Sequence, residues 1–140
     1  MEKSGPIVFI DDDPDDQQLL HDIFADMGII SQLKIFSSGE LALAYLREPE
    51  TKPFLVISDI NMPRMSGFEL RTLLQEDTKL SEKCIPFIFC TTGATGNVVC
   101  EAYRQSVQGI FQKPVQYAQW KSMLQAIIAY WSEGISPNRF

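Results

Sequence analysis

Residues 7–14 are Ile7-Val8-Phe9-Ile10-Asp11-Asp12-Asp13-Pro14, four apolar residues followed by three aspartates and a proline. An unbroken apolar run of this length is typical of a strand buried on both faces of a parallel sheet. Aspartate directly before proline favours the start of a helix, with Asp13 as the N-cap and Pro14 in the first turn. The stretch therefore predicts a buried strand that passes almost at once into a helix.

The same alternation of short apolar runs and longer amphipathic segments continues along the chain. Further strands are predicted at Lys34–Phe36, Leu55–Ser58, Phe87–Cys90 and Gly109–Gln112. Helices are predicted at Pro14–Met27, Gly39–Glu48, Phe68–Glu76, Gly96–Gln105 and Val115–Trp131. Five strands alternating with five helices predict an α/β fold with right-handed crossovers, an open parallel sheet covered by helices on both faces.

Length and composition describe a single domain without a membrane segment. The chain has 140 residues and a formal net charge of -6, which argues against a nucleic-acid surface because such surfaces are basic. No apolar stretch approaches the ~20 residues that span a bilayer, and residues 1–6 lack the apolar core of a signal peptide. Three cysteines without a paired spacing favour a reducing compartment, so we expect a cytoplasmic protein.

Polar residues stand directly after the predicted strands. Asp11 and Asp12 follow the first strand, Asp59 follows the third, Thr91 the fourth and Lys113 the fifth. A ligand of an open α/β sheet lies beyond the carboxyl ends of its strands, so these side chains are expected in one crevice. Clustered carboxylates repel one another unless a cation compensates their negative charge. Mg²⁺ fits such a cluster, because it prefers oxygen ligands. A lysine ammonium and a hydroxyl group beside this cluster are suited to donate hydrogen bonds to phosphoryl oxygens.

Not every aspartate near the first strand is assigned to that crevice. Asp13 is interpreted as the helix cap, and Asp15 and Asp16 as acidic residues that complement the helix dipole. Capping does not account for Asp11 and Asp12, because both precede the N-cap residue.

Four motifs in this order give the chain a family resemblance. They are Ile7–Pro14, Asp59-Ile60-Asn61-Met62-Pro63-Arg64-Met65-Ser66-Gly67, Ile85-Pro86 through Thr91, and Lys113-Pro114, with Ser38-Gly39-Glu40-Leu41-Ala42 as a weaker fifth. Together they resemble the receiver domain of bacterial two-component response regulators, of the single-domain chemotaxis type. The resemblance implies a flavodoxin-like doubly wound five-stranded sheet with strand order 2-1-3-4-5. It also implies one receiver domain over residues 1–140, with a core at about 7–131 and no output domain.

The resemblance assigns a role to each site residue. Asp59 would be the phosphoacceptor, and Asp12 and Asp59 would bind Mg²⁺ together with the backbone carbonyl of Asn61. Asp11 would complete the acidic pocket through a water. Lys113 would pair with Asp59 and then with the phosphoryl group, which Thr91 would also contact.

The resemblance also implies partners, a turn and a switch. The phosphoryl donor would be a histidine kinase or a histidine phosphotransfer protein, and output would pass to another protein, with no nucleic acid or membrane involved. Any activity beyond accepting the group would be self-phosphorylation from small donors and autodephosphorylation. A cis peptide bond is expected between Lys113 and Pro114. Ile110 stands where the family usually has Tyr or Phe, which predicts that the ring movement of the usual switch is absent.

Two other functions are compatible with parts of the sequence. A phosphatase of the haloacid dehalogenase type would use Asp11 as nucleophile in an Asp-x-Asp pattern with Asp13, although Asp15 stands where that pattern has Thr or Val. A degenerate receiver would keep the fold as a binding platform without being phosphorylated, although the presence of Asp59 and Lys113 counts against it.

Overall fold

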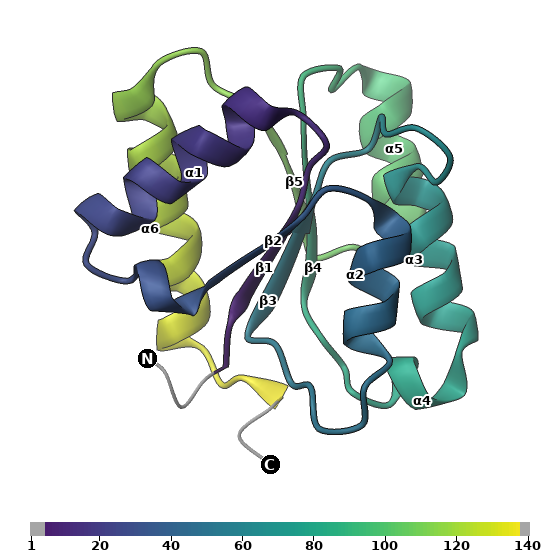
Figure 1. Ribbon diagram of the computed structural model, residues 1–140. Helices are drawn as coiled ribbons and strands as arrows, with labels where there is room; N and C mark the ends of the chain where they lie inside the picture. Colours follow the sequence, from purple (N-terminus) through teal and green to yellow (C-terminus); the bar gives the residue numbers. More distant parts are fainter. Residues whose placement is uncertain (1–4, 138–140) are drawn as a thin grey trace.

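A computed structural model describes residues 5–137 of the chain (Figure 1). The described residues form a five-stranded sheet with the order β2-β1-β3-β4-β5, in which every neighbouring pair is parallel. The strands are β1 (Ile7–Ile10), β2 (Leu33–Phe36), β3 (Leu55–Ser58), β4 (Phe87–Thr91) and β5 (Gly109–Gln112). The predicted flavodoxin-like sheet and its strand order are confirmed.

Helices cover both faces of this sheet. They are α1 (Pro14–Asp26), α2 (Gly39–Leu46), α3 (Gly67–Glu76), α4 (Thr78–Ser81), α5 (Gly96–Arg104) and α6 (Tyr117–Glu133), with a short 3₁₀ helix at Ile30–Gln32. Figure 1 shows α1 and α6 on one face and α2, α3 and α5 on the other. The last helix begins two residues later than predicted, because Gln116 has an extended backbone and takes the N-cap position. None of the described helices is both long and apolar enough to cross a bilayer.

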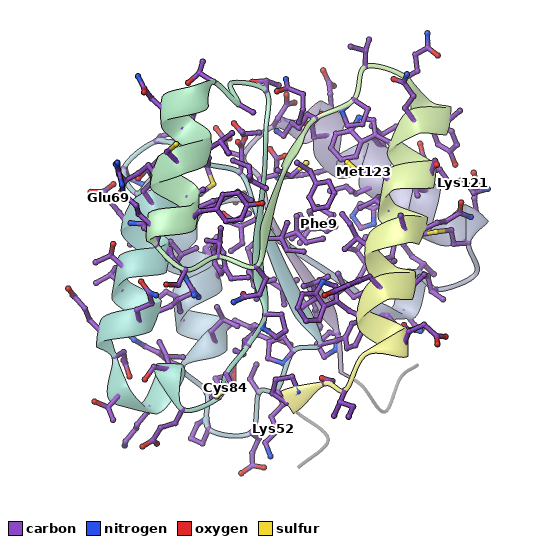
Figure 2. All side chains as sticks on the ribbon, turned by 180° about the vertical axis from the view of Figure 1, so that it is seen from behind. Phe9, Lys52, Glu69, Cys84, Lys121 and Met123 are labelled. Atoms are coloured by element: carbon purple, nitrogen blue, oxygen red, sulfur yellow. The ribbon has the colours of Figure 1, made fainter. Side chains whose placement is uncertain are left out.

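Each face of the sheet has its own hydrophobic core because strand side chains alternate between the two faces. Along β1, Ile7 and Phe9 pack against α1 and α6, whereas Val8 and Ile10 pack on the side of α2 and α3. Figure 2 shows Phe9 and Met123 in the layer between the sheet and α6. The central strands β1, β3 and β4 are completely buried, which explains why their sequences are unbroken apolar runs.

Capping side chains fix where several helices start, close to the carboxyl ends of the strands. The Asp13 carboxylate accepts a hydrogen bond from the Asp15 backbone N–H (2.8 Å), which confirms Asp13 as the N-cap of α1. Ser66 and Glu69 form a reciprocal capping box at α3, and Thr95 caps α5. These caps hold three helix N-termini around the edge of the sheet where Asp11 and Asp59 lie.

Candidate functional site

Backbone hydrogen bonds extend the sheet by one residue and align the polar side chains at its carboxyl edge. The Asp11 N–H donates to the Phe36 carbonyl (3.0 Å), and the Asp59 N–H donates to the Ile10 carbonyl (2.9 Å). The Lys113 N–H donates in the same way to the carbonyl of Thr91 (2.9 Å). Asp11, Asp59 and Lys113 are therefore positioned by the sheet itself and not by flexible loops.

The Lys113 ammonium lies at the centre of the site. Its Nζ atom is 2.8 Å from Asp11 Oδ2, 2.8 Å from Asp16 Oδ2 and 3.0 Å from Asp59 Oδ2. Only 7% of the lysine side chain is exposed. Burial alone would lower the pKa of Lys113, but the hydrogen bonds to the three carboxylates outweigh it and raise the pKa above its ordinary value. The lysine is therefore a fixed positive charge.

Asp16 belongs to this site, so its interpretation as a helix-dipole residue alone was wrong. The residue is in the first turn of α1, and its side chain is turned inward to Lys113. Its position contains a signal that could have found it. Asp16 precedes Leu20 and Ile23 by four and seven residues, and both of these are buried in the core. Helical periodicity therefore places Asp16 at the end of the inward stripe, whereas Asp15 is exposed.

Asp11 is the most deeply buried carboxylate of the site. Burial raises its pKa to about 6, although the hydrogen bond from Lys113 opposes the change. Its Oδ1 accepts a hydrogen bond from the Asp13 N–H (3.0 Å), and its Oδ2 pairs directly with the lysine. The expected role of Asp11 through a water stays a prediction.

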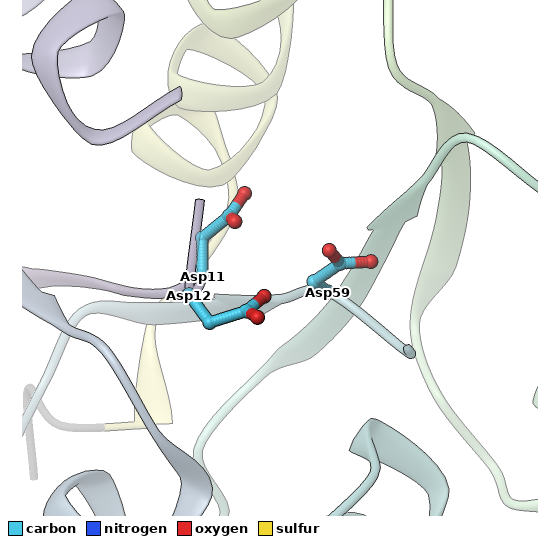
Figure 3. Close-up of side chains that lie close together, drawn as sticks. All are labelled: Asp11, Asp12 and Asp59. Atoms are coloured by element: carbon cyan, nitrogen blue, oxygen red, sulfur yellow. The ribbon is translucent and has the colours of Figure 1, made fainter. Parts of the chain in front are cut away.

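Three carboxylates could hold a metal ion together. One oxygen from each of Asp11, Asp12 and Asp59 lies within 4.8 Å of the others. Figure 3 shows the Asp12 carboxylate directed toward Asp59, with Asp11 beside it. Among the described residues, the Asp12 carboxylate has neither a hydrogen bond nor an ion pair. Hard oxygen donors with one uncompensated carboxylate fit a small divalent cation with several waters.

The carboxylate of Asp59 is held at both oxygens and by close packing behind it. Oδ1 accepts the N–H of Ile60 (2.7 Å), and Oδ2 accepts from Lys113. The loop then returns so that the Gly67 N–H donates to the Ile60 carbonyl (2.7 Å). A Cβ at Gly67 would lie 2.3 Å from the Asp59 carbonyl oxygen and 2.9 Å from the Cα of Ile60.

A glycine is therefore needed at position 67, because the Asp59 carbonyl leaves no room for a side chain. Its backbone conformation does not require a glycine, because the described glycines with positive φ are Gly5 and Gly28. Close approach of two backbones is the other general reason for a glycine.

The remaining predicted site residues lie at the same edge. Thr91 is buried at the end of β4, and its hydroxyl oxygen accepts a long hydrogen bond from the Gly93 N–H (3.4 Å). Asn61 is exposed two residues after Asp59, and the role of its carbonyl stays a prediction. Ile110 packs into the core beneath α3 and α5, whereas Phe111 packs on the opposite face. These neighbouring side chains of β5 therefore point to opposite faces of the sheet.

The predicted cis bond between Lys113 and Pro114 is wrong, because the described chain contains no cis peptide bond. The lysine reaches Asp59 from a trans backbone, with its N–H held by Thr91 and its flexible four-carbon stem spanning the remaining distance.

The pattern required by a haloacid dehalogenase-type phosphatase does not converge on the site. Asp13 and Asp15 are both exposed. The Asp13 carboxylate is used as the cap of α1, so it does not face Asp11 across a shared pocket. Asp59, in contrast, lies beside Asp11 and Asp12.

Comparison with known proteins agrees with this geometry. A family model described as the response regulator receiver domain matches residues 7–125. Response regulator Rcp1 of Synechocystis is 25% identical over 135 residues, which cover 93% of this chain and 90% of that protein. Chemotaxis protein CheY-3 of Vibrio cholerae is 27% identical over 127 residues, covering 91% and 94%. The crystal structure of the phosphorylated cyanobacterial phytochrome response regulator RcpA has a TM-score of 0.82 at 22% identity, covering 95% of this chain and 99% of that one.

Proposed function

Since the chain belongs to the family of response regulator receiver domains, we propose that it is a signalling switch that accepts a phosphoryl group on Asp59. The observation that carries the proposal is the placement of Asp59. Its carboxylate lies at the carboxyl edge of the sheet, within 3.0 Å of the Lys113 ammonium and beside the carboxylates of Asp11 and Asp12. Receiver domains are phosphorylated by histidine kinases and signal to downstream targets. The donor proposed here is a phosphohistidine on a histidine kinase or a phosphotransfer protein.

In the proposed step an oxygen of Asp59 attacks the phosphorus of the phosphohistidine. The new P–O bond forms while the P–N bond breaks, and the released imidazole nitrogen keeps the bonding pair and takes a proton. A carboxylate is repelled by an anionic donor, so the reaction needs positive charge and alignment at the site. Lys113 provides a fixed charge beside Asp59, and the N–H that it directs at Asp59 can donate to a phosphoryl oxygen.

The product is an acyl phosphate, whose hydrolysis makes the signal temporary. Thr91 is placed to donate its hydroxyl to a phosphoryl oxygen, because it ends the strand next to Asp59. That contact would draw the loop after β4 toward the site and bias a two-state segment. The further chemistry proposed for the chain itself is self-phosphorylation from small donors and autodephosphorylation.

We assign the divalent cation to Mg²⁺, held by Asp12, Asp59 and the Asn61 carbonyl, with Asp11 behind a water. The donor set is all oxygen, and the free carboxylate of Asp12 is the ligand most available to it. When bound, the ion would supply positive charge to the transferring oxygens. The relative Rcp1 has been crystallised in a Mn(2+)-bound form, which supports a divalent site in this fold.

The alternatives are less well supported. The family match and the outward position of Asp13 argue against a phosphatase based on Asp11. A degenerate receiver has no need to keep Lys113 in contact with Asp59, and here that contact is present and buried. We also propose that output passes to a protein target in the cytoplasm, without nucleic acid or membrane.

The first test uses a small phosphodonor. Acetyl phosphate with Mg²⁺ is expected to add one phosphoryl group to the wild-type chain in intact mass spectra. Asp59→Asn is expected to gain none, because an amide cannot form the acyl phosphate. Asp15→Asn is the matched control, since Asp15 is an exposed aspartate outside the carboxylate cluster. Equal labelling of Asp59→Asn and wild type would reject Asp59 as the acceptor.

The second test concerns the metal ligands. Asp12→Asn is expected to weaken Mg²⁺ binding by at least about ten-fold, or ~1.4 kcal/mol, because it removes a charged ligand that has no other partner. Calorimetric titration measures the affinity, and Asp15→Asn controls for the change in net charge. Undiminished Mg²⁺ affinity in the Asp12 variant would exclude Asp12 as a ligand.

A further inference from the structure

Asp16 is a site residue that neither the family motifs nor the metal cluster includes. It is the third residue of α1, and its Oδ2 accepts a hydrogen bond from Lys113 Nζ at 2.8 Å. The two side chains come from positions 97 residues apart. The contact therefore joins the start of α1 to the end of β5 across the site.

Helix electrostatics do not explain this contact. Acidic residues in a first turn interact favourably with the helix dipole while they remain in solvent, as the exposed Asp15 does. The Asp16 side chain is only 21% exposed, and it gives up hydration to reach a lysine that is itself 7% exposed. Burial of a carboxylate is costly unless a charged partner is close, so the ion pair is the reason for the inward orientation.

The three partners of Lys113 differ in what phosphorylation would do to them. Asp59 would become an acyl phosphate, and its oxygen near Lys113 would no longer carry a carboxylate charge. Asp11 and Asp16 would stay as they are, one on the sheet and the other on α1. Two acceptors on different elements fix the position of an ammonium and leave its third N–H directed toward Asp59. Asp59 alone could not do so, because it is the group that reacts.

We propose that Asp16 is a positioning residue that anchors the Lys113 ammonium to helix α1, so that the lysine stays in place when the phosphoryl group replaces the Asp59 carboxylate as its partner. This inference rests on the proposed function of Asp59. It goes beyond that function in making the N-terminus of α1 part of the phosphoryl-binding machinery. Such an anchor is a form of preorganisation, in which the N–H donor of the lysine need not be reoriented during the reaction.

The test must separate the hydrogen-bond acceptor from the charge, because removal of an anion by itself favours binding of another anion. Asp16→Asn removes the charge and keeps an acceptor oxygen, whereas Asp16→Ala removes both. The corresponding pair Asp15→Asn and Asp15→Ala has the same changes in charge and in helix propensity one residue earlier. In each measurement, the Asn and Ala variants at position 16 are compared, and the difference between the two variants at position 15 is subtracted. The remainder reports the contribution of the acceptor oxygen at position 16.

The first measurement is made on the unphosphorylated protein and is independent of the proposed function. The ¹H–¹⁵N signal of the Lys113 ammonium, identified by its loss in Lys113→Arg, is expected to persist in wild type and in Asp16→Asn. In Asp16→Ala its hydrogen exchange is expected to rise by about ten-fold, the scale of one hydrogen bond to a charged group. An unchanged signal in Asp16→Ala would overturn the inference. Backbone amide spectra show whether each variant is folded.

The second measurement uses beryllofluoride with Mg²⁺ as a phosphoryl mimic. Asp16→Ala is expected to bind it about ten-fold more weakly than Asp16→Asn, while the two position-15 variants bind equally. Equal binding of the two position-16 variants would also overturn the inference. If wild type itself bound no beryllofluoride, the proposed function would fail, and the ammonium signals would still decide whether Asp16 anchors the lysine.

Discussion

Gly67 connects Asp59, the proposed phosphoacceptor, to the start of α3 through a backbone contact that leaves no room for a side chain. A methyl group there would meet the Asp59 carbonyl at 2.3 Å, and this atom is part of the backbone and cannot rotate away. Gly67→Ala is therefore expected to lower the free energy of unfolding by about 1–3 kcal/mol, the usual cost of overpacking. Chemical denaturation measures this change.

Gly96 is the matched control for Gly67. Each is the first residue of its helix, and a Cβ at Gly96 would have no neighbour within 4 Å. Gly96→Ala is expected to be neutral or to stabilise the fold by about 0.4–1 kcal/mol, because alanine restricts the unfolded chain. If both alanine variants unfolded at the same denaturant concentration, the packing explanation for Gly67 would be wrong.

Among single residues, the sequence predicts those site residues that stand at or directly after the end of a strand. Asp11, Asp12, Asp59, Thr91 and Lys113 were found because parallel strands bring their carboxyl ends to one edge of a sheet. Asp16 was missed because acidic residues in a first helical turn have a sufficient local explanation. The reason for Gly67 becomes visible only in the structure, because the carbonyl that a side chain there would meet belongs to Asp59.

Among the elements, α5 is attached to the rest of the molecule mainly at its C-terminal end. Its only buried residue is Ala102. After the helix, the carbonyl of Gln105 accepts hydrogen bonds from Arg71 Nε (3.1 Å) and Gln75 Nε2 (3.0 Å), and the carbonyl of Ser106 accepts from Arg71 Nη2 (2.8 Å). Helix α3 thus holds the far end of α5, while the Gly96 end adjoins the loop from Thr91.

This attachment predicts where the phosphorylation signal moves the chain. Addition of beryllofluoride and Mg²⁺ is expected to shift the amide signals of residues 91–98 strongly and those around Ile110 weakly. Ile110 has no ring that could swing inward, and its side chain is packed in the core. A response centred on Ile110 that disappears in Ile110→Ala would contradict this prediction.

The elements themselves were predicted with uneven success, for a physical reason. The strands β1, β3 and β4 were located nearly to the residue, because burial on both faces demands an unbroken apolar run. The four-residue helix α4 was not predicted, because one turn is too short to show a helical period. The late start of α6 at Tyr117 depends on the extended backbone of Gln116, which hydrophobic periodicity does not encode.

For the whole molecule, two hydrophobic cores pack on the two faces of the sheet, and the carboxyl ends of its strands concentrate charge. Asp11, Asp16 and Asp59 contact a single lysine there, and Asp12 lies beside Asp11 and Asp59. Removal of both cores from water stabilises the fold. The excess of carboxylates over cations at one point needs a different explanation, and the proposed binding of a divalent cation provides it.

The central claim is that Asp59, among these crowded carboxylates, is the residue that carries the phosphoryl group. Borohydride reduces an aspartyl phosphate to homoserine, so reduction after phosphorylation marks the reacted residue permanently. Peptide mapping by mass spectrometry then locates it. The account predicts homoserine at position 59 alone, dependent on both the phosphodonor and Mg²⁺. Homoserine at Asp11 or Asp12, or its absence from position 59 in a chain that has gained a phosphoryl mass, would contradict it.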